Sequence, residues 1–140
     1  MKPFTLGPVE LTIVALDSGR PSPGILAALA AQVDSGAVRL VDFVVIEKSL
    51  DGHMTVSEVD RVDYAFAGLE FCARGLAGYE DLRILADRMM PGTCAAVIGF
   101  EPVWSRLLDE QLAEVGAVVI GTERIPAVVA NAVLELSAET

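Results

Sequence analysis

The chain is poor in the residues that most often carry catalysis or nucleic-acid binding. Its 140 residues include one histidine, two cysteines and one tryptophan, and aromatic residues make up only 6%. Lys and Arg number 10 against 20 Asp and Glu, which gives a net charge of −10. Nucleic acids and anionic membrane surfaces both need clustered positive charge, so neither is expected as a partner. We interpret the negative charge as a device that keeps an apolar chain in solution.

Long hydrophobic runs are also missing, although 53% of the residues are hydrophobic. No run approaches the roughly 18 apolar residues of a membrane-spanning helix, so membrane insertion is not expected. The length suits one domain with a real core and is too short for two ordinary domains. We therefore predict a single domain over residues 1–140, with part of its apolar surface covered by a second subunit.

Motifs that hold metals, cofactors or disulfides are absent from the sequence. Cys72 and Cys94 have neither a CxxC nor a metal-like spacing, which predicts free thiols. His53 is alone beside a turn, so no metal set forms around it. No phosphate-binding glycine loop, nucleophile elbow or dinucleotide fingerprint occurs. Residues 1–8 lack an apolar signal core and a cleavage site, which predicts a cytoplasmic protein.

What is present is a regular succession of strand and helix patterns. Apolar, β-branched runs predict strands at Val9–Asp17, Val38–Ser49, His53–Val59, Thr93–Phe100 and Ala117–Thr122. Amphipathic spacing and proline starts predict helices at Pro23–Ser35, Val62–Tyr79, Glu80–Met90, Val103–Val115 and Pro126–Leu136. The Asp-Gly pair at 51–52 predicts a hairpin between the second and third strands.

A loose duplication appears in this order, because strand–helix–strand occurs over Val9–Ser49 and again over Thr93–Thr122. Two such halves with a hairpin between them predict an α+β fold, a ferredoxin-like sandwich of two βαβ halves. Right-handed crossovers would place the helices on one face of the sheet. The other face would be apolar, so either the extra helices or a second subunit must cover it.

The Gly-rich stretch before residue 80 carries a second pattern, a stripe with spacings of four, three, four and three. Its members are Ala65, Leu69, Cys72, Leu76 and Tyr79. Such spacing is typical of a helix that packs on another helix, within or between subunits. The three glycines of this stretch weaken the helix by about 1 kcal/mol each, so a broken or short helix is also compatible with the sequence.

Glu101, Trp104 and Arg124 are the candidate ligand-binding residues, because each lies at or near a predicted strand-to-helix junction. An arginine beside a helix start suits a carboxylate or phosphate, and a buried Glu101 could act as a general acid or base. A structural interpretation competes with both. In it Glu101 interacts with the helix N-terminus or pairs with Arg106 or Arg124, while Trp104 is buried against the sheet.

Two further alternatives involve Asp17. This residue is a second possible partner for Arg124. Asp17, Glu47 and Glu101 all lie near strand ends, so a carboxylate cluster that binds a divalent cation is conceivable. Their spacing does not bring them together, and no catalytic residue or metal ligand is assigned.

Several motifs together resemble an uncharacterised, mainly actinobacterial domain-of-unknown-function family, number six-three-two-five. The matching stretches are Gly7-Pro8-Val9-Glu10, Gly36 with Val38–Asp42, Asp51-Gly52, Met90–Ala96, Phe100-Glu101 with Trp104, and Arg124-Ile125-Pro126. The resemblance covers nearly the whole chain and implies a small cytoplasmic α+β protein with no assigned reaction. The chain is more distantly similar to a larger uncharacterised family in which a glycine-zipper hairpin separates the two βαβ halves.

The apolar excess, the helical stripe and the missing catalytic constellation favour a non-enzymatic module that self-associates, in a structural assembly or as a small regulatory unit. The expected partner is therefore a second copy of the chain, and no cofactor is expected. The alternative is a small-ligand-binding protein or enzyme with an anionic-ligand pocket at Glu101, Trp104 and Arg124.

Overall fold

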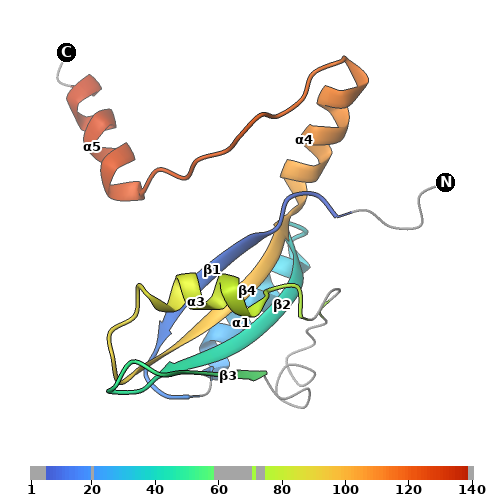
Figure 1. The fold of residues 1–140 in the computed structure, drawn as a ribbon. Coiled ribbons are helices and arrows are strands. Elements are labelled where there is room, and N and C mark those ends of the chain that lie inside the picture. Colours follow the sequence, from blue (N-terminus) through green and yellow to red (C-terminus); the bar gives the residue numbers. More distant parts are fainter. Residues whose placement is uncertain (1–5, 20, 59–70, 72–74, 139–140) are drawn as a thin grey trace. The chain divides into compact units, whose positions relative to one another are not determined.

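A computed structural model describes residues 6–19, 21–58, 71 and 75–138 (Figure 1). The chain divides into two compact units, residues 1–108 and 109–140. The first unit contains β1 (Glu10–Leu16), α1 (Pro23–Asp34), β2 (Val38–Lys48), β3 (Met54–Glu58), α3 (Tyr79–Ala86) and β4 (Thr93–Pro102). Helix α4 (Val103–Glu114) begins in the first unit and ends in the second, which also contains α5 (Ala127–Ala138).

Four strands form an antiparallel sheet in the order β1-β4-β2-β3. β4 is central and pairs with β1 on one side and with β2 on the other. β2 continues through a tight hairpin into β3, which lies at the edge of the sheet. β1 and β2 are both antiparallel to β4, so the chain from β1 through α1 to β2 is a β-α-β unit with β4 inserted between its strands.

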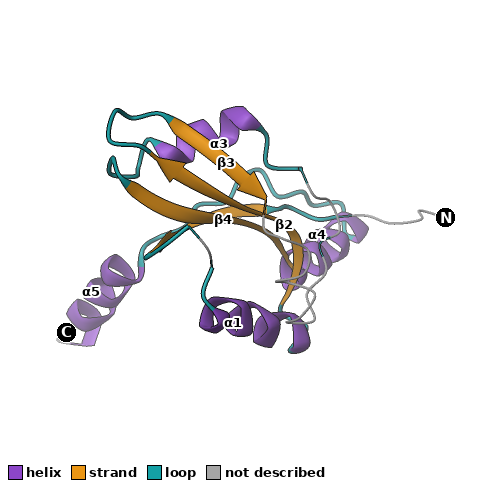
Figure 2. Cartoon of the chain, turned by 90° about the horizontal axis from the view of Figure 1, so that it is seen from below, coloured by secondary structure: helices purple, strands orange, loops and turns teal. Residues whose placement is uncertain are grey.

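β2 explains why the sheet is covered on both faces. Its residues from Leu40 to Ile46 are all buried, and a strand buried on both sides needs a layer on each. Phe43 and Val45 belong to a cluster packed against α1, whereas Val44 and Ile46 belong to a cluster packed against α3. Figure 2 shows α1 and α3 on opposite faces of the sheet.

This arrangement confirms a mixed α+β fold with four helices and a four-stranded antiparallel sheet among the described residues. The ferredoxin-like sandwich is not confirmed, because α1 and α3 lie on opposite faces instead of one. No helix in the described ranges is long and apolar enough to cross a membrane.

The predicted helix over Val62–Tyr79 lies largely outside the described residues, and with it Ala65, Leu69 and Cys72 of the stripe. The described end of this segment is not helical: Gly75 has φ +87°, and α3 begins only at Tyr79. A left-handed glycine ends a helix instead of continuing it. Leu76 and Tyr79 are both exposed, and the helix–helix contact of this stripe stays a prediction.

In the second unit, residues 115–126 form neither helix nor strand before α5 begins. The strand predicted over Ala117–Thr122 is therefore not formed within the described residues. A strand exists only where its backbone N–H and C=O groups pair with a neighbour, and no described strand pairs with this segment. The single-domain organisation stays a prediction.

Candidate functional site

Glu101 occupies the point where β4 meets α4, and its side chain is fully buried. Oε2 accepts a hydrogen bond from the backbone N–H of Gly7. Oε1 accepts one from Nε of Arg106 at 3.3 Å and forms an ion pair with Nη2 of Arg39 at 3.7 Å. Both carboxylate oxygens therefore interact with protein groups, and the carboxylate has no surface open to a ligand.

Local sequence explains how this cluster assembles. Arg39 lies directly opposite Glu101 in the β2–β4 register, and Arg106 is the fourth residue of α4, which begins directly after β4. The N-terminal segment crosses the start of α4 so closely that a Cβ on Gly7 would lie 2.7 Å from Cβ of Arg106. Glycine is the residue that permits this approach. The cluster ties the segment before β1, strand β2 and helix α4 together.

Trp104 is 65% exposed, so the prediction that it is buried against the sheet is wrong. The reason is the helical position of its neighbour. Arg106 turns inward to reach the buried carboxylate, and Trp104, two residues earlier, lies about 200° away around the helix axis. The amphipathic pattern predicted the helix, but it could not tell which side chain would occupy the inward side.

Arg124 is an exposed residue of the second unit, and its pairing with Glu101 or Asp17 stays a prediction. The structural interpretation of Glu101 is confirmed in one respect, because it pairs with Arg106. Ligand binding by Glu101, Trp104 and Arg124 stays a prediction too, although the buried position of Glu101 gives it no support.

The carboxylate cluster that would hold a divalent cation does not form. Glu47 is paired with Cys94 and Glu101 with Arg39 in the β2–β4 ladder, so the two carboxylates lie at opposite ends of β4. Cys94 and Glu101 are seven residues apart along β4, a span of about 24 Å at 3.4 Å per residue. In the part of the chain that the structure describes, no group of three potential metal ligands occurs.

Asp42 is a buried carboxylate that the sequence analysis missed. It follows a register shift between β2 and β4, and its Oδ1 accepts from the N–H of Phe43 at 2.9 Å. Oδ2 accepts from the N–H of Ala77 at 3.1 Å. A lone acidic residue within the apolar run Val41–Ile46 was the available signal. Its role is structural, because it fixes the segment before α3 to the centre of the sheet.

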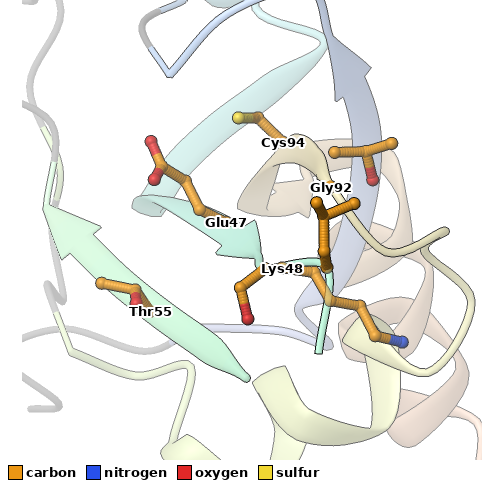
Figure 3. Close-up of a pocket in the computed structure, with 8 residues that line it drawn as sticks. Glu47, Lys48, Thr55, Gly92 and Cys94 are labelled. Atoms are coloured by element: carbon orange, nitrogen blue, oxygen red, sulfur yellow. The ribbon is translucent and has the colours of Figure 1, made fainter. Parts of the chain in front are cut away.

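An open pocket of about 280 Å³ lies where β2, β3 and β4 meet the hairpin and the loop before β4 (Figure 3). Its lining residues are Glu47, Lys48, Ser49, Leu50, Thr55, Gly92, Thr93 and Cys94. Thr55, Glu47 and Cys94 are cross-strand neighbours in one row of the sheet. The pocket thus offers a hydroxyl, a carboxylate and a thiol to a small molecule.

The thiol of the pocket lies beside a carboxylate. A reactive cysteine needs a positive charge or a helix N-terminus nearby, whereas the register neighbour of Cys94 is the carboxylate of Glu47. Lys48 is engaged elsewhere, because its Nζ donates to the carbonyls of Ala86 and Met89, both at 3.1 Å. There it stabilises the C-terminal end of α3. We therefore assign no catalytic step to this pocket.

Large apolar side chains on the surface are the remaining candidate for function. In residues 115–136, ten large hydrophobic side chains are exposed: Val115, Val118, Val119, Ile120, Ile125, Val128, Val129, Val133, Leu134 and Leu136. No residue of α5 is buried. Monomeric proteins rarely expose contiguous apolar surface on this scale, and such surfaces mark interaction sites.

The fold and these surfaces characterise a small α+β protein with exposed apolar side chains over residues 115–136. Residues 3–139 match the family described as "Family of unknown function (DUF6325)", so the chain belongs to that family. The resemblance of the sequence motifs to this family of unknown function is thereby confirmed. No curated protein and no solved structure matches the chain.

Proposed function

We infer that this protein is a non-enzymatic module that works by associating with further copies of itself, as a unit of a structural or regulatory assembly. The observation that carries the proposal is the run of exposed apolar side chains from Val115 to Leu136. Burying a large aliphatic side chain contributes about 1.5–3 kcal/mol. A segment with ten such side chains therefore gains a large free energy when it is buried in an interface.

Charge supports the same proposal. The net charge of −10 opposes unspecific aggregation of an apolar chain. Association through a defined apolar contact is compatible with this charge, because such a contact need not bring like charges together. A standard interface takes about 20–30 residues from each partner, and the second unit, residues 109–140, is of comparable size.

Substitution of one exposed leucine by glutamate tests the proposal. Leu134 lies in α5 and is 67% exposed, so Leu134→Glu should leave the fold unchanged by circular dichroism. We expect its light-scattering mass at micromolar concentration to fall toward the 14.8 kDa of one chain.

The control is Leu50→Glu, which changes a leucine that is also exposed, in the β2–β3 hairpin of the first unit. It should keep the mass of the unmodified protein. Equal masses for both variants and the unmodified chain would exclude α5 from the contact, and a monomeric unmodified chain would refute the proposed function.

A further inference from the structure

One edge of the sheet is open and lacks the usual protection. β1 pairs with β4 along all seven residues from Glu10 to Leu16, and within the described residues no strand lies on its other side. Natural edge strands are typically short, or carry Lys, Pro or a bulge, which discourages further pairing. β3, at the opposite edge, is short and rich in polar residues. β1 is longer and reads Glu-Leu-Thr-Ile-Val-Ala-Leu, without lysine or proline.

The same chain contains a strand-like segment without a strand to pair with. Residues 117–122 read Ala-Val-Val-Ile-Gly-Thr, a composition typical of a strand. Within the structure as described they pair with no strand, and Ile120 is 99% exposed. The segment is one residue shorter than β1, so its backbone groups can pair along nearly the whole of that edge.

The topology of the sheet indicates that residues 117–122 pair with the open edge of β1. In the first half of the chain, β1, α1 and β2 leave a one-strand gap that β4 fills. The second half repeats the order with β4, α4 and residues 117–122. By the same rule the last segment runs parallel to β4 with one strand between them. β2 is already flanked by β3, so that position is the outer side of β1, and the pairing with β1 is antiparallel.

The start of α4, which lies in the first unit, favours a second copy as the partner of this segment. A crossover helix packs on its own sheet, as α1 does with Leu26 buried after a loop of six residues that follows β1. Between β4 and α4 there is no loop, because Pro102 ends the strand and Val103 begins the helix. Trp104 and Leu107 are exposed instead of covering the sheet.

We propose that residues 117–122 pair as an antiparallel strand with the outer edge of β1 in a second copy of the chain, and that the exchange is reciprocal. The inference rests on the proposed self-association and specifies its contact. Reciprocal exchange gives a closed dimer with a twofold axis. Each copy donates its residues 117–122 to the partner and receives the partner's segment at the outer edge of its own β1. The backbone groups at the outer edge of β1 and those of residues 117–122 would then be hydrogen-bonded to each other.

Disulfide cross-linking tests the pairing directly in the full chain. With Cys72→Ala and Cys94→Ala as background, Thr12→Cys is combined in turn with Val119→Cys, Ile120→Cys or Gly121→Cys, because antiparallel pairing of residues 117–122 along Glu10–Leu16 places position 12 opposite 120 or 121. Directly opposed residues of antiparallel strands have Cβ atoms about 4.5–5.5 Å apart, close enough to form a disulfide with small adjustment. At least one combination should oxidise to a covalent dimer on a non-reducing denaturing gel.

The control replaces Thr12→Cys by Thr55→Cys, because Thr55 lies on the other edge strand, β3. It should give no covalent dimer above the level of the single variants. In a Thr12→Cys variant, a disulfide that forms within a single chain would overturn the proposal in favour of closure on the same sheet. Such a disulfide would be identified by peptide mass in the monomer band. If none of the three combinations with Thr12→Cys forms a disulfide, the proposal is overturned as well.

A proline variant gives an independent readout. Val119→Pro removes a backbone N–H and is incompatible with a paired strand, so the dimer dissociation constant should rise by about tenfold or more. Glu123→Pro, just beyond the segment, should change it by no more than about twofold. Both variants should keep the circular dichroism of the unmodified chain. An unchanged constant for Val119→Pro would contradict the strand pairing.

The two proposals fail in distinguishable ways. If the unmodified chain has the mass of a monomer at every concentration, self-association itself is wrong, and the strand exchange with it. If the chain is an oligomer but the Thr12→Cys variants form no disulfide to position 119, 120 or 121, self-association stands and the strand exchange is wrong.

Discussion

Arg106 reaches back across the junction of β4 and α4 and donates from Nε to Oε1 of Glu101 at 3.3 Å. The carboxylate is fully buried, whereas the guanidinium group keeps some contact with water. A residue at the end of a strand is thereby linked to the second turn of the helix that follows. Because the Gly7 N–H binds the same carboxylate, the junction also fixes the chain where it enters β1.

Loss of this carboxylate is expected to destabilise the first unit. Glu101→Leu leaves the N–H of Gly7 without its acceptor and removes the counter-charge of Arg39 and Arg106, and breaking a buried pair in this way costs about 3–5 kcal/mol. Glu101→Gln keeps one acceptor and should cost less. Urea denaturation measures both, with exposed Glu10→Gln as control. Equal stability of Glu101→Leu and the parent would show that the cluster contributes nothing.

Asp42→Asn tests the hydrogen bonds at the centre of the sheet. Asp42 accepts from two backbone N–H groups, those of Phe43 and Ala77. An asparagine offers one acceptor and one donor, so an N–H group would face another N–H. We expect a loss of about 1–3 kcal/mol and faster amide exchange at Ala77. Asp17→Asn, at an exposed position, should change neither, and slow exchange at Ala77 in Asp42→Asn would contradict the assignment.

Trp104→Ala and Leu82→Ala should differ strongly in stability. Leu82 is 3% exposed in the cluster beneath α3, so truncating it should cost about 2–5 kcal/mol. Trp104 is mostly exposed, so its truncation should change the free energy of unfolding by about 0.5 kcal/mol at most, as for other surface substitutions. Thermal unfolding followed by circular dichroism compares the two. A large loss in Trp104→Ala would place its ring in the core after all.

Asp51 provides a pH-dependent contribution at the β2–β3 hairpin. The hydroxyl of Ser49 and the N–H of His53 donate to its carboxylate and lower its pKa below 3.8. A folded-state pKa below the unfolded value adds stability that is complete above about pH 4 and is lost as the pH falls through the lowered folded-state value. A carboxyl NMR titration should show the pKa rising in Ser49→Ala and unchanged in Ser57→Ala. An unchanged value in Ser49→Ala would refute this cause.

Most elements of the first unit could be predicted because their signals are local. The β-branched runs, the proline at the start of α1 and the Asp-Gly hairpin depend only on neighbouring residues, and each predicted strand of this unit occurs within a few positions of its expected bounds. The layering was harder to predict. β2 is buried on both faces of the sheet, but the expected ferredoxin-like arrangement placed the helices on one face.

The site could be predicted only in part, for reasons of long-range geometry. Glu101 stood out because of its place at a strand end, whereas Arg39 matters only through its register with β4. Trp104 had the spacing of a core residue, but the inward side of α4 is determined by the contact of Arg106. The strand propensity of residues 117–122 is also a local property. Whether these residues form a strand depends on pairing with the edge strand of a sheet.

Sedimentation equilibrium of the unmodified full-length chain, over a dilution series through the micromolar range, tests the central claim of self-association most directly. The proposal predicts a mass of twice 14.8 kDa at the upper concentrations, with dissociation toward one chain on dilution. A mass of 14.8 kDa at every concentration would contradict it.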